Sequence, residues 1–261
     1  MTDCLHYAFQ DGVATLVMAG DEQGSVLTGD VLTGIRRAVA SANRETDCRV
    51  IVLRSAGSGF CDGMDLNLFA DGRTPGRDYF ELFADCLKDL CRSRRPVLAA
   101  VHGEVRGGGA GLAAACDIVL GADDAGFSLP EVLLGMIPAL VTPVLLRRIS
   151  VATLRTLTLG TRRIDAAEAK QSGLVDEVVS SLDEAVAGQV ERVCRSSSDA
   201  IRQARDYFDR ITEDVLDYQM QCAVDEICGW LTRPGVVEGI QLFADGHAPP
   251  WTAKRKMDQH D

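Results

Sequence analysis

The amino-acid sequence predicts an α/β protein with a helical C-terminal region, and two observations carry that prediction. Up to about residue 180, short apolar runs alternate with stretches of helical periodicity. This alternation is typical of strands joined by helices, and it favours a largely parallel sheet. From about residue 182 the strand-like runs stop while the helical periodicity continues. We therefore expect an α/β core over residues 1–190 and a helical region over residues 191–261.

The expected strands of the core are short and apolar. The first alternates apolar with smaller or polar residues, as a half-buried strand does. The second and third are the compact runs RVIVL and VLAAV, which are typical of strands buried on both faces. Glycine-rich turns follow both runs. The five expected strands cover 12–18, 49–53, 97–101, 118–120 and 175–179.

The expected helices carry apolar residues at spacings of three and four. In the helix over 28–43, Leu32, Ile35 and Val39 fall on one stripe. The helix over 77–93 has the same pattern with larger, partly aromatic residues. We found no internal repeat among these segments. The expected helices are 28–43, 77–93, 107–115, 142–159, 165–172, 182–230 and 234–245.

The composition is that of a globular protein with an acidic surface. Hydrophobic residues make up 46% of the 261 residues and charged residues 25%. The chain has 27 Lys and Arg against 38 Asp and Glu, a formal net charge of −11. This charge disfavours nucleic-acid binding, which needs a basic surface.

No segment of the sequence is typical of an export signal or a membrane span. The longest charge-free run, 132–146, is too short for a span and contains two prolines. The nine cysteines form no CxxC pair and the four histidines do not cluster with them. We therefore expect a cytoplasmic protein with reduced cysteines, without a metal site and without membrane contact.

Two glycine-rich turns follow buried strands and are candidates for ligand binding. Gly57, Gly59 and Gly63 come close to a dinucleotide-binding pattern, but a helix rather than a strand follows them. The turn at 107–109 has three successive glycines where a helix begins, so free N–H groups can face a ligand. One N–H from each turn would form an oxyanion hole, suited to a thioester that loses an α-proton. Close helix packing is the alternative explanation.

Glu131 is a lone carboxylate ahead of the apolar run VLLGMIP. It fits two interpretations. One is a charge at the start of a helix beside Pro130. The other is a carboxylate in an apolar pocket, where its pKa rises and suits proton transfer near neutral pH.

Four motifs in order resemble the enoyl-CoA hydratase/isomerase, or crotonase, superfamily. They are FCDGMDL (60–66), AAVHGEVRGGGAGLAAACDIVL (99–120), FSLPEVLLGMIP (127–138) and GTRRIDAAEAKQSGLVDEVV (160–179). The resemblance implies a crotonase-like spiral of ββα turns with a helical C-terminal subdomain used in trimerisation. It also implies a homotrimer or hexamer and an acyl thioester, carried on CoA or phosphopantetheine, with no cofactor.

Carried onto this sequence, the resemblance places the oxyanion N–H groups at Met64 and Gly108 and the catalytic carboxylate at Glu131. Asp65 is a second catalytic candidate, with helix capping as its alternative role. Gly111 stands where typical hydratases carry another glutamate, and bulky residues follow Pro138 in place of glycines, so two-carboxylate hydration is in doubt. The residues expected to bind substrate are Asp62, Arg106, Gly107 and Gly111.

A narrower resemblance, extended by the closing APPW, is to the dehydratase of polyketide β-branching cassettes. It implies loss of water from 3-hydroxy-3-methylglutaryl-acyl carrier protein to give 3-methylglutaconyl-acyl carrier protein. The alternatives are a Δ3,Δ2-enoyl-CoA isomerase or an enoyl-CoA hydratase acting on a CoA ester. A non-catalytic binding protein is the third possibility.

A carrier protein and a distal carboxylate would both need cations. The candidates for the distal carboxylate are Arg106, Arg147 and Arg148, and those for a carrier surface are Arg92, Arg94 and Arg95 with Lys254, Arg255 and Lys256. The alternative is an ordinary solvated surface.

His102 is expected to be a core histidine whose ring nitrogens are hydrogen-bonded, and Cys61 lacks a histidine partner for nucleophilic catalysis. Trp251 lies either in a loose tail or packed against the body of the protein or a neighbouring subunit.

Overall fold

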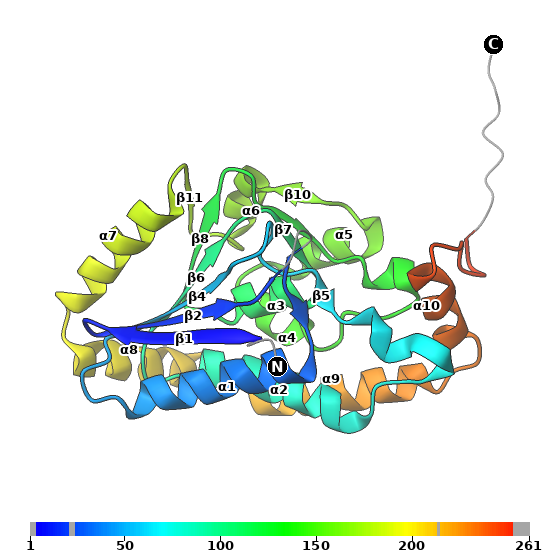
Figure 1. The fold of residues 1–261 in the computed structure, drawn as a ribbon, viewed down its shortest axis with the longest axis horizontal. Helices are drawn as coiled ribbons and strands as arrows, with labels where there is room; N and C mark the ends of the chain where they lie inside the picture. The colour runs from blue at the N-terminus through cyan, green and yellow to red at the C-terminus, as the bar shows by residue number, and fades with distance from the viewer. Residues whose placement is uncertain (1–3, 21–23, 213–214, 253–261) are drawn as a thin grey trace, which may run out of the picture.

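The computed structural model describes residues 4–20, 24–212 and 215–252. Its centre is a six-stranded sheet in the order β1-β2-β4-β6-β8-β11 (Figure 1). β1 and β2 form an antiparallel hairpin, and the other neighbours are parallel. The strands are β1 (Leu5–Gln10), β2 (Val13–Met18), β4 (Val50–Ser55), β6 (Val97–Val101), β8 (Ile118–Ala122) and β11 (Glu177–Val179).

Two small sheets lie beside the large one and complete a spiral. After β4, β6 and β8 the chain adds in turn β5, β7 and β9, and then continues into helical segments. This is the ββα progression that the resemblance implied. The short strands are β3 (Val26–Leu27), β5 (Gly63–Met64), β7 (Glu104–Arg106), β9 (Gly126–Ser128) and β10 (Ile164–Asp165).

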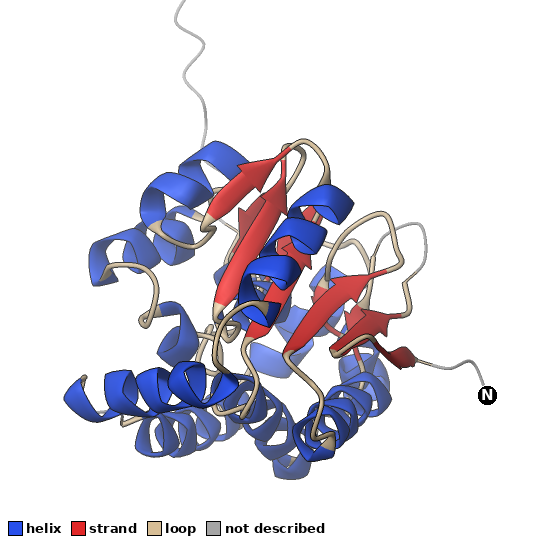
Figure 2. Cartoon of the chain, turned by 90° about the vertical axis from the view of Figure 1, so that its left-hand side faces the viewer, coloured by secondary structure: helices blue, strands red, loops and turns tan. Residues whose placement is uncertain are grey.

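The central strands β4 and β6 are buried on both faces because their side chains alternate between two cores. In β4, Ile51 and Leu53 join the main core, whereas Val50 and Val52 join a smaller one. The smaller core is closed by α7 (Leu182–Cys194), which crosses the outer face of the sheet (Figure 2). The main core is covered by α1 (Gly29–Arg44), α2 (Arg77–Cys91) and α3 (Gly108–Ala114).

The C-terminal helices cover the part of the core that holds the two glycine turns. Helix α9 packs on α2 and α4, and α10 packs on the 3-10 segments η1 and η2 (Figure 1). The 3-10 segments are η1 (Leu66–Gly72) and η2 (Glu131–Leu134). The remaining helices are α4 (Thr142–Leu145), α5 (Val151–Gly160), α6 (Ala166–Ser172), α8 (Ser198–Ile211), α9 (Leu216–Leu231) and α10 (Val236–Ala244).

The α/β class and the helical C-terminal region are confirmed, with differences in detail. The expected helix over 142–159 is two helices, because Ser150 caps a new one through the backbone N–H of Thr153. The expected helix over 182–230 is three helices, and a second serine cap, Ser197, begins α8. β1 was not expected. The predicted boundary at residue 190 lies inside α7, and the two-domain division and trimerisation stay predictions.

No helix in the described ranges is long and apolar enough to cross a membrane. Within the same ranges, no group of three or more His, Cys, Asp or Glu side chains is arranged to hold a metal ion.

Arg205 on α8 ties the C-terminal region to the core. Its Nε donates to Oδ1 of Asp117 over 2.8 Å, and its Nη2 donates to the carbonyl of Cys91 over 3.0 Å. Its Nη1 donates to the carbonyl of Ser93. The guanidinium therefore satisfies backbone carbonyls that lie between α2 and β6, and it is largely buried, with 16% of its side chain exposed.

Replacing Arg205 by Ala should lower the free energy of unfolding by about 2 kcal/mol, because several charge-assisted hydrogen bonds are lost together. Urea unfolding followed by circular dichroism measures this. Arg202→Ala on the same helix is the control: it removes an exposed pair with Asp199 and should change the free energy by less than about 0.5 kcal/mol. Equal losses in both variants would contradict the assigned role of Arg205.

Candidate active site

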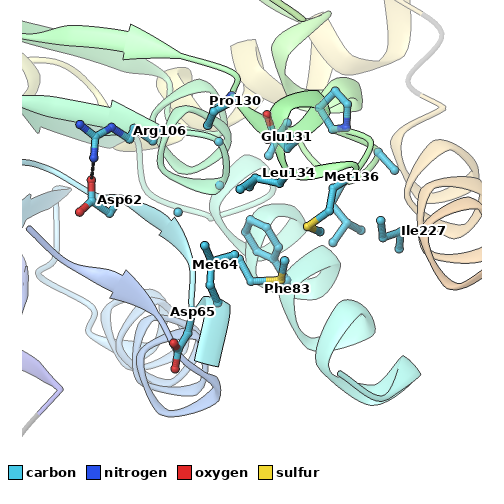
Figure 3. Close-up of a pocket in the computed structure, with 18 of the residues that line it drawn as sticks. Asp62, Met64, Asp65, Phe83, Arg106, Pro130, Glu131, Leu134, Met136 and Ile227 are labelled. Carbon is cyan, nitrogen blue, oxygen red and sulfur yellow. Dashed lines mark hydrogen bonds and ion pairs between the residues drawn. The ribbon is translucent and has the colours of Figure 1, made fainter. Parts of the chain in front are cut away.

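A cavity of about 500 Å³ lies between the core and the C-terminal helices (Figure 3). The ββα spiral contributes the turn at β5 and the start of α3, and the segment η2 adds a wall opposite. Helices α9 and α10 contribute Ile227 and Phe243. The wall is mostly apolar, and its larger side chains include Phe80, Phe83, Leu134, Met136, Ile137, Leu140 and Val141.

Glu131 is the first residue of η2 and turns its carboxyl toward the start of α3. A Cβ atom at Gly107 would lie 2.9 Å from Oε1 of Glu131, so the carboxyl touches the glycine backbone directly. Its Oε2 is shielded from solvent and has no hydrogen-bond partner among the described residues. Burial in this apolar surrounding raises the pKa of Glu131 from 4.5 to about 7. The carboxyl can therefore both accept and donate a proton near neutral pH.

The two glycine turns meet at the cavity because their strands pair. Cys61 forms a bridge with Val105, and the N–H of Arg106 donates to the carbonyl of Cys61 over 2.8 Å. Gly63 has a φ of +90°, and a Cβ atom there would lie 3.0 Å from the carbonyl oxygen of Arg106 and 3.4 Å from the nitrogen of Gly108. Only glycine allows this approach.

Met64 and Gly108, the predicted oxyanion residues, both line the cavity. Gly108 is the first residue of α3, where an N–H has no partner within the helix. Gly107 precedes it with a φ of +47°, which directs the chain sharply from β7 into the helix. The spiral thus brings Met64, Gly108 and Glu131 to one cavity, as expected from the sequence.

Gly111 differs from its expected role in substrate binding. It is not among the described residues that line the cavity, whereas Val141 is. A Cβ atom at Gly111 would lie 2.6 Å from Cγ1 of Val141. The side chain of Val141 therefore fills the space in front of Gly111. A glutamate at position 111 would collide with Val141, so the glycine at 111 and the bulky valine at 141 fit each other.

Asp65 lines the cavity, but its carboxylate accepts a hydrogen bond from the backbone two residues on. Its Oδ1 accepts the N–H of Asn67 over 2.9 Å and caps η1. Figure 3 shows the carboxylate turned away from Glu131. The capping alternative raised from the sequence describes this geometry.

Asp62 and Arg106 line the cavity as an ion pair, with 2.8 Å between Oδ1 and Nη1 (Figure 3). Nη2 of Arg106 also lies 3.4 Å from Oε2 of Glu104, whose Oε1 accepts from Nε of Arg163 over 2.8 Å. Arg106 is the cation that lines the described part of the cavity. Its charge is shared between two carboxylates.

The other candidate cations lie elsewhere. Arg147 pairs with Asp209, and Arg148 pairs with Asp176. Neither is among the described residues that line the cavity. Arg92 pairs with Asp217. Lys254, Arg255 and Lys256 lie outside the described residues.

His102 and Cys61 have structural roles. Nε2 of His102 lies 2.8 Å from the carbonyl oxygen of Gly57, which agrees with a satisfied histidine. Cys61 is fully buried, and burial raises the pKa of its thiol to about 12. It therefore holds too little thiolate to act as a nucleophile.

Sequence reasoning missed the residues that give the cavity its apolar wall. Phe83 on α2, Ile227 on α9 and Phe243 on α10 all line it. Their only sequence signal was helical periodicity, which predicts burial but not which partner or cavity a side chain faces.

A family model of enoyl-CoA hydratase/isomerase proteins matches residues 8–254. The chain belongs to the enoyl-CoA hydratase/isomerase family of enzymes. A protein named "Probable enoyl-CoA hydratase echA8" from Mycobacterium bovis is 31% identical, over 87% of this chain and 90% of its own. A carnitinyl-CoA dehydratase from Citrobacter koseri is 28% identical, over 97% of this chain and all of its own. The solved structure of an enoyl-CoA hydratase from Mycobacterium avium superposes with a TM-score of 0.84, at 25% identity, over 97% of this chain and all of that one.

Replacing Gly111 by Ala should lower the free energy of unfolding by about 1–3 kcal/mol, because the new Cβ atom meets Val141. In a Val141→Ala background the same change should cost much less, and urea unfolding of the four proteins measures the coupling. Gly188→Ala is the control, since a Cβ atom there meets nothing within 4 Å. Additive effects of the two changes would contradict the packing described for this pair.

Proposed function

We propose that this chain is a hydro-lyase that removes water from a 3-hydroxyacyl thioester, with Glu131 as its single acid–base group. One observation carries the proposal: Glu131 holds an unpartnered, buried carboxylate oxygen in an apolar cavity. The other carboxylates that line the described cavity already have partners, since Asp62 pairs with Arg106 and Asp65 caps η1. The chemistry must therefore use one carboxyl.

In the proposed reaction the ionised Glu131 removes a proton from C2 of the acyl chain. Charge then builds on the thioester oxygen, and the N–H groups of Met64 and Gly108 stabilise it. The C3–O bond breaks, a double bond forms between C2 and C3, and Glu131 returns its proton to the departing hydroxide. One molecule of water leaves, and the carboxylate is regenerated. A single carboxyl can reach both groups only when they leave from the same face.

CoA is the carrier best supported by the relatives, whose names describe an enoyl-CoA hydratase and a carnitinyl-CoA dehydratase. The apolar wall formed by residues such as Phe83, Leu134 and Met136 suits an aliphatic acyl chain. The proposed reaction uses the thioester alone and needs no cofactor.

Replacing Glu131 by Gln should lower kcat for dehydration of 3-hydroxybutyryl-CoA by about 10²–10⁴-fold, because Gln cannot move a proton. In the wild-type enzyme kcat/KM should rise with pH through an apparent pKa near 7, since the base acts only when ionised. Absorbance of the enoyl thioester measures both. A Gln variant with wild-type activity would contradict the role of Glu131.

The finer form of the proposal takes 3-hydroxy-3-methylglutaryl-acyl carrier protein as the substrate. The sequence resemblance supports it, and so does Arg106, a cation at the cavity that can meet a distal carboxylate. Its existing pair with Asp62 means that the substrate would share or displace that partner.

If that substrate is correct, Arg106→Gln should lower kcat/KM for it at least about tenfold, the loss of one charge-assisted hydrogen bond. Activity on 3-hydroxybutyryl-CoA should change little in the same variant. Arg163→Gln is the control, because Arg163 belongs to the same ion-pair network but does not line the described cavity. Mass spectrometry of the loaded carrier protein, which loses one water on reaction, gives the readout. Equal effects on both substrates would contradict the assignment.

Isomerisation of a Δ3-enoyl-CoA to the Δ2 isomer is the second candidate. The apolar cavity with one free carboxyl favours it, because a proton shift from C2 to C4 needs one base and no bound water. A higher kcat/KM for 3-enoyl-CoA than for any 3-hydroxyacyl thioester would select this activity.

A further inference from the structure

The segment that carries Glu131 is a single short turn. Within it, the N–H of Leu133 donates to the carbonyl of Pro130 over 2.9 Å, and the N–H of Met136 donates to the carbonyl of Glu131 over 2.8 Å. Gly135 ends the turn with a φ of +73°. A 3-10 turn this short has few bonds of its own, so its position depends on the contacts around it.

Trp251 packs against this turn from beyond the last helix. A Cβ atom at Gly135 would lie 2.2 Å from Cη2 of Trp251, and one at Gly239 would lie 2.0 Å from the same atom. The indole therefore sits between two glycines, one on the Glu131 turn and one on α10. Its N–H also donates to the carbonyl of Leu133 over 3.3 Å.

Trp230 on α9 holds the same turn from a second direction. Its indole N–H donates to the carbonyl of Gly135 over 2.7 Å. The guanidinium of Arg233 lies 4.4 Å from the centroid of its ring and packs over it. The sequence contains two tryptophans, so both contact the segment that carries Glu131.

Leu134 and Met136, the two neighbours of Gly135 in the chain, line the cavity together with Glu131. We propose that Trp251 is a positioning residue, which with Trp230 presses the Glu131 turn against the cavity and keeps the carboxyl shielded from water. The proposal rests on the proposed function insofar as Glu131 is the acid–base group. It assigns to the C-terminal segment 247–252 a task in catalysis without contact with the substrate.

Two consequences follow from this arrangement. Without the indole of Trp251, water gains access to Oε2 of Glu131, and the pKa of that carboxyl falls toward its ordinary value. Because both indoles contact the turn, tryptophan fluorescence should also change when Glu131 ionises, with no substrate present. This makes the position of the turn measurable independently of the reaction.

The charged groups near the turn determine how the titration is designed. Asp62, Asp65 and Arg106 line the cavity with Glu131, and Glu238 lies on α10. His247 lies in the same C-terminal segment as Trp251, and its imidazole is removed so that it adds nothing to the titration. All proteins should therefore carry His247→Asn, an exposed position.

In that background, tryptophan emission of the otherwise unchanged protein should titrate with a midpoint near pH 7, and Glu131→Gln should abolish the transition. Trp251→Ala should move the midpoint down by at least about one pH unit, and Trp251→Phe should restore most of it, because a phenyl ring still fills the space between the glycines. Thr252→Ala, an exposed neighbour in the same segment, is the matched control and should not shift the midpoint.

Circular dichroism and the thermal midpoint establish that each variant is folded. A folded Trp251→Ala protein with an unshifted midpoint would overturn the proposal, and so would a transition that survives Glu131→Gln. On an active substrate, Trp251→Ala should lower kcat at least about tenfold while KM changes little, as expected of a displaced acid–base group. If no thioester tested is a substrate, the proposed function fails while the fluorescence titration still decides the role of Trp251.

Discussion

The isolation of one carboxyl in an apolar cavity is the constraint on which the rest of this site depends. Glu131 has an oxygen without a partner, and burial raises its pKa to about 7. An ionised carboxylate in such a place is costly, so the fold must hold it there by other contacts. The glycine backbone at Gly107 and the two tryptophans behind the turn provide those contacts. The carboxyl is thus held mainly by packing, because its one hydrogen bond is to its own backbone N–H.

The same packing limits the chemistry that the cavity can perform. Val141 occupies the space in front of Gly111, so no second carboxylate can project into the cavity from that position without repacking. In the proposed reaction Met64 and Gly108 would contribute backbone N–H groups, and the bridge between Cys61 and Val105 and the start of α3 place both residues at the cavity. Under the proposed function, activation of the thioester would depend on the backbone, whereas proton transfer would depend on the side chain of Glu131.

Much of this could be predicted from the sequence, because strands with β-branched runs and amphipathic helices have strong local signals. The glycine turns were noted because successive glycines mark unusual backbone. The local pattern left Glu131 with two interpretations, and the family resemblance assigned it to the site. The two-residue strands β3 and β5 carry no periodicity, so they were missed. The breaks between helices at Ser150 and Ser197 depend on serine N-caps, and a continuous helical periodicity does not show where such a cap begins a new helix. The placement of Phe243 and Trp251 against the site arises from contacts between segments more than 100 residues apart, which no local pattern encodes.

The geometric course of water loss tests most directly whether one carboxyl performs both proton transfers. The substrate is 3-hydroxybutyryl-CoA carrying deuterium at one of its two C2 positions, prepared as both stereoisomers, and mass spectrometry of the enoyl product reports which label is lost. With Glu131 acting alone, the C2 proton and the C3 hydroxyl should leave from the same face. Loss of the label from the opposite face would require a second acid–base group and would contradict a single-carboxyl site.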